Sequence, residues 1–98
     1  MVVIVFRARL REGVNLVALE ALGKRMFELA SAMPGFVSYK DFSASDGEGV
    51  SIVEFENEAS VQAWYAHPEH REAQQKGRAE IFSEYRVQVC TPYRERRL

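Results

Sequence analysis

The segment Val2–Leu10 constrains the fold most, because its first half is apolar on both sides of a predicted strand. Val, Ile and Phe dominate the segment, and these residues favour extended structure. Side chains alternate along a strand, so the even-numbered residues share one face while Val3 and Val5 lie on the other. A strand that begins apolar on both faces is typical of a central strand covered from both sides.

An amphipathic helix is predicted after Gly13. Asn15 can cap it by accepting a hydrogen bond from a free backbone N–H. Apolar residues then recur at spacings of three and four, which marks one face of a helix. This stripe consists of Leu19, Leu22, Met26, Leu29 and Met33. Pro34-Gly35 ends the helix, because proline cannot continue it and glycine accepts a positive φ.

Two further strands and a second helical region follow. The strands are Phe36–Ser43 and Val50–Glu56, with a hairpin turn at Asp46-Gly47. Asn57 caps a short helix whose apolar side holds Val61, Trp64 and Tyr65. His67-Pro68 bends the path, a helical segment runs from Pro68 to Phe82, and the last strand is Tyr85–Thr91.

The element order is therefore β-α-β-β-α-β, which predicts an α+β, ferredoxin-like fold with an antiparallel four-stranded sheet. We expect one domain over residues 1–98. Two helices cover only one face of such a sheet, yet both faces carry apolar residues. An open apolar face of this size predicts a partner, and we expect a homodimer in which two sheets pack face to face.

Charge and composition exclude several classes of protein. The net charge is −1, whereas domains that grip nucleic acid usually have a basic excess, so we expect no nucleic-acid partner. The longest apolar run, Met1–Phe6, is far too short to span a membrane. No signal-peptide pattern precedes it, so we expect the mature chain to start at Met1. Cys90 is the only cysteine, which favours a reducing cytoplasm, and we expect it to be a small buried hydrophobe.

Four segments together resemble the antibiotic biosynthesis monooxygenase domain family, within the dimeric α/β-barrel superfamily. They are Met33–Phe36, Trp64–His70, Gly77-Arg78 and Tyr85–Cys90. The resemblance runs over essentially the whole chain, and the tract from Trp64 to His70 is its most specific part. It implies a ferredoxin-like protomer and a dimer whose sheets form a barrel.

The resemblance also implies a range of activities. Some members oxygenate polycyclic phenols or quinols without metal or flavin, others degrade haem, and many have no known activity. Haem-degrading members use an Asn on the first strand, a Trp and a proximal His. Trp64 matches the Trp, but Val2–Leu10 contains no Asn and Gln74 stands near the expected histidine position. Haem degradation is therefore disfavoured, and we expect no cofactor.

His70 and Trp64 are the candidate catalytic residues. His70 shares a helical face with the small residues Ala73 and Gly77, which leave room either for a ligand or for close approach of the sheet. A histidine there could accept a phenol proton, or could be a core residue satisfied by a backbone carbonyl. Trp64 could stack on an aromatic substrate, or could anchor the core beneath the bend.

The candidate substrate-binding residues are Phe36, Tyr39, His67, Gln74, Arg78 and Tyr85. With Trp64, Phe36 would clamp the ring, while the two tyrosines could bind a phenolic oxygen or pack at the edge of the core. His67 could serve the bend instead, and Pro68 spoils the geometry for a metal pair with His70, so we expect no metal. Arg78 could balance an anionic substrate or pair with Glu80 or Glu84.

Two functions follow as hypotheses. The first is a cofactor-independent monooxygenase that oxidises a small aromatic phenol or quinol with O₂. The second is a non-catalytic homodimer that binds a small aromatic or fatty molecule, as in a stress response. A structural dimer whose own side chains fill the pocket is a further alternative. The absence of a glycine-rich phosphate loop and of a Ser-His-acid signature argues against kinases, dehydrogenases and ordinary hydrolases.

Overall fold

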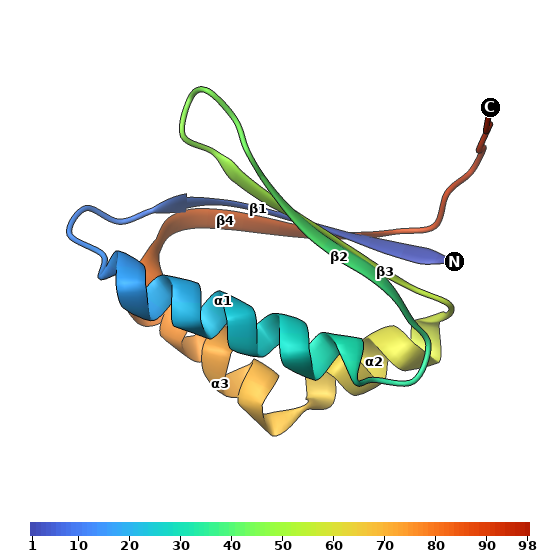
Figure 1. Ribbon diagram of the computed structural model, residues 1–98, viewed down its shortest axis with the longest axis horizontal. Coiled ribbons are helices and arrows are strands. Elements are labelled where there is room, and N and C mark those ends of the chain that lie inside the picture. Colours follow the sequence, from blue (N-terminus) through green and yellow to red (C-terminus); the bar gives the residue numbers. More distant parts are fainter.

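A computed structural model describes residues 1–98 and shows a four-stranded antiparallel sheet with all helices on one side (Figure 1). The strands, in the spatial order β2-β3-β1-β4, are β1 (Val2–Leu10), β2 (Phe36–Ser43), β3 (Gly49–Phe55) and β4 (Phe82–Cys90). The helices are α1 (Leu16–Ser31), α2 (Glu58–Ala66) and α3 (Pro68–Lys76), followed by a π-helical turn, Gly77–Ile81. The predicted ferredoxin-like α+β fold is confirmed. None of the helices has the length and apolar character needed to cross a membrane.

Side-chain caps set the starts of the three helices. The Oδ1 atoms of Asn15 and Asn57 accept hydrogen bonds from backbone N–H groups three residues on, at 3.1 and 2.9 Å. His67 does the same for α3, where its Nδ1 accepts from the N–H of Glu69 at 3.2 Å. These polar groups satisfy donors that the first turn of a helix leaves free, which is why the sequence reveals these boundaries.

The core lies between the helices and the β1–β3 half of the sheet. Ile4 on β1 pairs with Val53 on β3, and both are buried on the helix-facing side. The predicted α1 stripe supplies the opposite wall, with Met26 and Leu29 buried. The full cluster is Val2, Ile4, Met26, Leu29, Ala30, Val53, Phe55, Val61 and Trp64.

No helix covers the opposite face of the sheet, which carries Cys90 near one end. Cys90 pairs with Val3 and is exposed, so the expectation of a buried cysteine is wrong. The reason is its place on β4, the edge strand, on the uncovered face. At the other end of this face, Arg7 binds the Glu48 carboxylate with two hydrogen bonds, at 3.1 and 3.2 Å.

The connection from α3 to β4 differs from the prediction. The α-helix ends at Lys76 rather than Phe82, and the π-helical turn carries the chain directly into β4, which starts at Phe82 rather than Tyr85. Gly77 makes this possible, because the Phe82 ring folds back against it. A Cβ on Gly77 would lie 2.9 Å from Cε2 of Phe82. Ile81 is buried at the end of the turn, so tertiary packing favours the wider turn.

Candidate functional site

His70 stacks on Trp64 at the junction of α2 and α3. The two ring centroids are 3.8 Å apart and the rings are nearly parallel, at 16°. The imidazole Nδ1 lies 3.0 Å from the backbone carbonyl oxygen of Trp64. Pro68 at the first position of α3 makes this approach possible, because it turns the chain back after α2. The ring is thus held by one stacking contact and one hydrogen bond.

The hydrogen bond determines which nitrogen of His70 can act as a base. A carbonyl oxygen only accepts, so Nδ1 must carry the hydrogen and donate it. Burial lowers the pKa of His70, and the neighbouring charge of His67 lowers it further, against the opposing effect of the Trp64 carbonyl. The ring is therefore neutral at pH 7, and its Nε2 holds a free lone pair.

The Nε2 atom of His70 has no hydrogen-bond partner in the chain. Every buried side-chain nitrogen or oxygen of the chain has a hydrogen-bond partner. Because Nε2 of His70 has none, this atom is not fully buried and stays in contact with solvent. The backbone-carbonyl partner that the structural alternative predicted for His70 is present. It occupies only one nitrogen, and it leaves the other in the state that a general base requires.

Trp64 lies in the core rather than on an open surface. Its side chain is 3% exposed and belongs to the core cluster, and His70 covers one of its faces. Trp64 thus anchors α2 to the sheet and positions the imidazole through its ring and its carbonyl.

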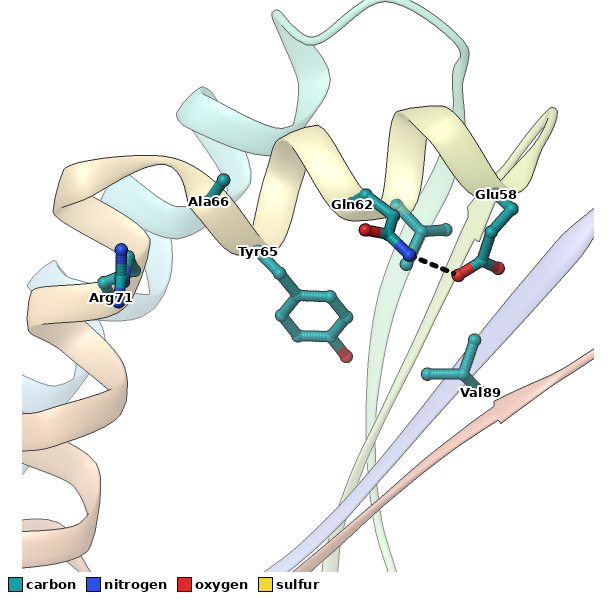
Figure 2. A pocket seen from close by; sticks show the side chains of 7 residues that line it. Glu58, Gln62, Tyr65, Ala66, Arg71 and Val89 are labelled. Carbon is teal, nitrogen blue, oxygen red and sulfur yellow. Dashed lines mark hydrogen bonds between the residues drawn. The ribbon is translucent and has the colours of Figure 1, made fainter.

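A cavity of about 540 Å³, open to solvent, lies between α2 and β4, as Figure 2 shows. The ring of Tyr65 projects from α2 toward the strands, and Val89 rises toward it from β4. The lining residues are Glu58, Val61, Gln62, Tyr65, Ala66, Arg71 and Val89. The volume falls in the range of small-molecule sites, roughly 300–1,000 Å³.

The cavity is apolar in its middle and carries opposite charges on different elements. Glu58, at the start of α2, accepts a hydrogen bond from Nε2 of Gln62 at 3.3 Å. Burial raises the pKa of Tyr65, and the Glu58 charge adds to this, so the phenol stays protonated. Arg71, on α3, also lines the cavity. The walls can therefore hold an aromatic ring and offer it both hydrogen-bond partners and charge.

None of the eight predicted site residues lines this cavity. His70 contacts one lining residue, since its ring stacks on Tyr65 with centroids 5.4 Å apart and an interplanar angle of 18°. Tyr65 therefore stands between the imidazole and the cavity. Of the other predicted residues on α3, His67 caps the helix and Gln74 is half-buried one turn beyond His70.

Phe36 and Tyr39 form a separate group on β2. Both rings pack edge-on against Phe27 of α1, with centroids 6.3 and 5.8 Å away. Burial raises the pKa of Tyr39 to about 12, with a further contribution from Asp41. The structure thus places these two residues in aromatic packing at the edge of the core, away from His70.

Arg78 and Tyr85 lie near the far end of β4. Tyr85 stacks on Phe6 with centroids 5.7 Å apart. Arg78 is exposed and makes neither of the expected ion pairs. Glu84 bonds to Arg9 at 3.2 Å instead, and Glu80 takes part in no ion pair. The space beside Gly77 is likewise taken by Phe82, so close packing rather than a ligand explains that small residue.

Sequence reasoning missed the residues that do line the cavity, above all Tyr65 and Arg71. Each is adjacent in sequence to a predicted residue, Trp64 and His70 respectively. The helical pattern assigned Tyr65 to the apolar side of its helix, which is correct, and its hydroxyl was the available signal of a polar site. Val89 lies within the last predicted strand, Tyr85–Thr91, but its exposure depends on where the helices stop.

The chain is similar to proteins of one family. Residues 1–76 match the family model described as antibiotic biosynthesis monooxygenase. A Bacillus subtilis (strain 168) protein, the uncharacterized protein YqjZ, is 32% identical over 73 residues, or 74% of this chain. The match spans 64% of that relative's length.

Two solved structures share the fold. Rv0793 from Mycobacterium tuberculosis has a TM-score of 0.83 at 22% identity, with 96% of each chain covered. SnoaB, a cofactor-independent oxygenase from Streptomyces nogalater, has a TM-score of 0.80 at 18% identity, covering 96% of this chain and 94% of its own. Together with the family model, which matches most of the chain, these findings show that the protein belongs to the antibiotic biosynthesis monooxygenase family.

Proposed function

We propose that this protein is a cofactor-independent monooxygenase that oxidises a small, electron-rich phenol or quinol with O₂. The observation that carries the proposal is the neutral His70, with Nδ1–H bound to the Trp64 carbonyl and Nε2 free. A cavity large enough for an aromatic ring lies on the far side of Tyr65. SnoaB, which shares the fold, is described as a cofactor-independent oxygenase, and this likeness supports the reaction class.

Because Tyr65 separates the imidazole from the cavity, Nε2 of His70 would take the phenolic proton through one bridging water molecule. The resulting phenolate would then pass one electron to O₂. The superoxide and the phenoxyl radical then join at a ring carbon, and loss of water leaves a quinone. For a phenol with an open para position, one oxygen atom enters the ring and the other leaves as water. The substrate supplies all four electrons, so the balance needs no metal or flavin.

The proposal includes a homodimer in a reducing cytoplasm, formed through the sheet face that the helices leave open. Val3, Val5 and Ile52 lie on this face and are partly exposed. The same face carries the ion pairs of Arg7 with Glu48 and of Arg9 with Asp46. Sedimentation at micromolar concentration tests this part, and a stable monomer would contradict it.

Oxygen uptake with a panel of quinols tests the reaction. We expect stimulated O₂ consumption by the wild-type protein and a loss of about 10²-fold or more in kcat for His70→Ala. Glu72→Gln, an exposed change on the same helix, is the matched control and should retain the wild-type rate. No stimulation by any quinol would refute the oxygenase, and full activity of His70→Ala would refute the assigned base.

A second function is favoured by one observation, namely that His70 does not line the cavity. A non-catalytic protein that binds a small aromatic molecule against Tyr65, Val61 and Val89 needs no general base among the residues that line the cavity. Tight binding of a quinol without O₂ uptake would support this function over the first.

A further inference from the structure

Several arginines of the helical layer and the sheet are held by carboxylates, whereas Arg71, like the exposed Arg78 and Arg86, is not. Arg7 and Arg9 pair with Glu48 and Asp46, at 3.1 and 2.9 Å. Arg25 pairs with Glu69 at 2.7 Å. Arg71 takes part in none of the ion pairs or side-chain hydrogen bonds of the chain, yet it lines the cavity between α2 and β4.

The sequence around Arg71 explains why it is free, because the positions three and four residues away hold His67, Pro68, Gln74 and Gln75 and no carboxylate. Glu69 is two residues from Arg71 on α3, but both of its carboxylate oxygens accept from Arg25 on α1, at 2.7 and 2.9 Å. Glu58, the one acidic residue of the cavity wall, lies at the start of α2 and bonds to Gln62. The cavity thus contains a guanidinium with its donors unused, beside an apolar surface.

We propose that Arg71 binds the carboxylate of the ligand, so that the cavity selects a hydroxyaryl monocarboxylic acid over a neutral phenol. This inference rests on the proposed function for the aromatic and hydroxyl parts of the ligand, and adds the acidic group. The planar guanidinium matches a carboxylate with two parallel hydrogen bonds. Tyr65, Val61 and Val89 offer the ring an apolar surface between the charged positions.

Glu58 limits the ligand to a single acidic group. A second carboxylate in the same cavity would meet the negative charge of Glu58 and be repelled. A hydroxyl, in contrast, can donate to Glu58, whose carboxylate accepts only one hydrogen bond from Gln62. Arg71 also follows His70 directly on α3, so an anchored carboxylate keeps the ring near the turn that carries the proposed base.

The test compares 2,5-dihydroxybenzoate with its methyl ester, which has the same ring and hydroxyls but no charge. Calorimetric titration should show that the wild-type protein binds the acid about tenfold more tightly than the ester. Arg71→Gln should abolish this preference, and Arg71→Lys should restore part of it. Lys76→Gln removes the same charge from an exposed position on the same helix and should keep the full preference.

Salt provides a readout that a merely structural role would not change. Binding of the acid should weaken between 50 mM and 500 mM NaCl, and binding of the ester should not. An unchanged preference in Arg71→Gln, equal affinity of the wild-type protein for both compounds, or no binding of either would overturn the inference.

The two proposals fail separately. Oxygen uptake with neutral quinols, without preference for the acid, would leave the oxygenase intact and remove the role of Arg71. Binding of the acid that depends on Arg71, without oxygen uptake by any quinol, would do the reverse.

Discussion

Ile4 and Val89 are direct partners on neighbouring strands and face the same side of the sheet, but their surroundings are opposite. Ile4 on β1 is 4% exposed, whereas Val89 on β4 is 47% exposed. The helices therefore cover the sheet as far as β1 and stop short of β4. Helix α3, which would have to cover β4, has no buried residue. The comparison teaches that the cavity arises because the helical layer is narrower than the sheet.

The largest effect should come from the covered half of this face. Phe55→Ala should lower the free energy of unfolding by about 3–5 kcal/mol, because the ring is completely buried and its loss leaves a cavity. Val89→Ala should cost less than about 1 kcal/mol, since nearly half of its side chain already contacts solvent. Urea unfolding of both variants measures the difference. Equal losses would mean that β4 is covered in solution.

Alanine substitutions at Gly77 and, as a comparison, at Gly23 test whether the space at the α3–β4 connection is filled. Gly77→Ala should destabilise the protein by about 1–3 kcal/mol, because the new Cβ meets the Phe82 ring. Gly23→Ala on α1 meets nothing within 4 Å and should stabilise the helix by about 0.5–1 kcal/mol. Thermal unfolding of the two variants should show shifts of opposite sign. A stabilised Gly77→Ala protein would show that the connection has spare room.

The protonation of His70 makes the free energy of unfolding depend on pH. Burial lowers the pKa of His70 in the folded chain, so the unfolded state binds the proton more readily. The contribution of His70 is complete above its unfolded pKa, near 6.5, and is lost as the pH falls through the lower folded value. Stability should therefore rise from pH 5 to pH 7, with a smaller rise in His70→Gln. A proton NMR titration of His70 at or above the ordinary histidine pKa would contradict this.

The smallest effect should come from the ion pair that joins α1 to α3. Arg25 and Glu69 are each about half exposed, at 48% and 45% of the side chain. Arg25→Gln should therefore cost less than about 1 kcal/mol, and the loss should shrink in high salt. Denaturant unfolding at two salt concentrations measures it. A loss above 2 kcal/mol would show that this pair, rather than the core, holds α3 in place.

Local signals predicted most of the fold. Asn15 and Asn57 cap helices as expected, and the α1 stripe faces the core, because caps and periodicity act within a few residues. The connection at Gly77 was not predictable in this way. Its π-helical turn depends on Phe82 folding back onto Gly77, which a helical pattern cannot indicate.

The candidate site was less accessible to sequence reasoning. The sequence singled out His70 and Trp64, and the structure brings the two rings together at 3.8 Å. It did not indicate that Phe36 and Tyr39 pack around Phe27, nor that Tyr65 and Arg71 line the cavity. These positions depend on the packing of α2 and α3 against the sheet.

By itself, the sequence determined the order of the elements, the faces of the strands and the family resemblance, because periodicity, caps and turns are local properties of the chain. Tertiary structure alone decided that β4 stays uncovered, that the Trp64 carbonyl selects the tautomer of His70, and that Glu69 bonds to Arg25. Each of these depends on contacts between elements distant in the sequence or on how one element turns back onto another. The chemistry of the cavity is therefore a property of the assembled fold.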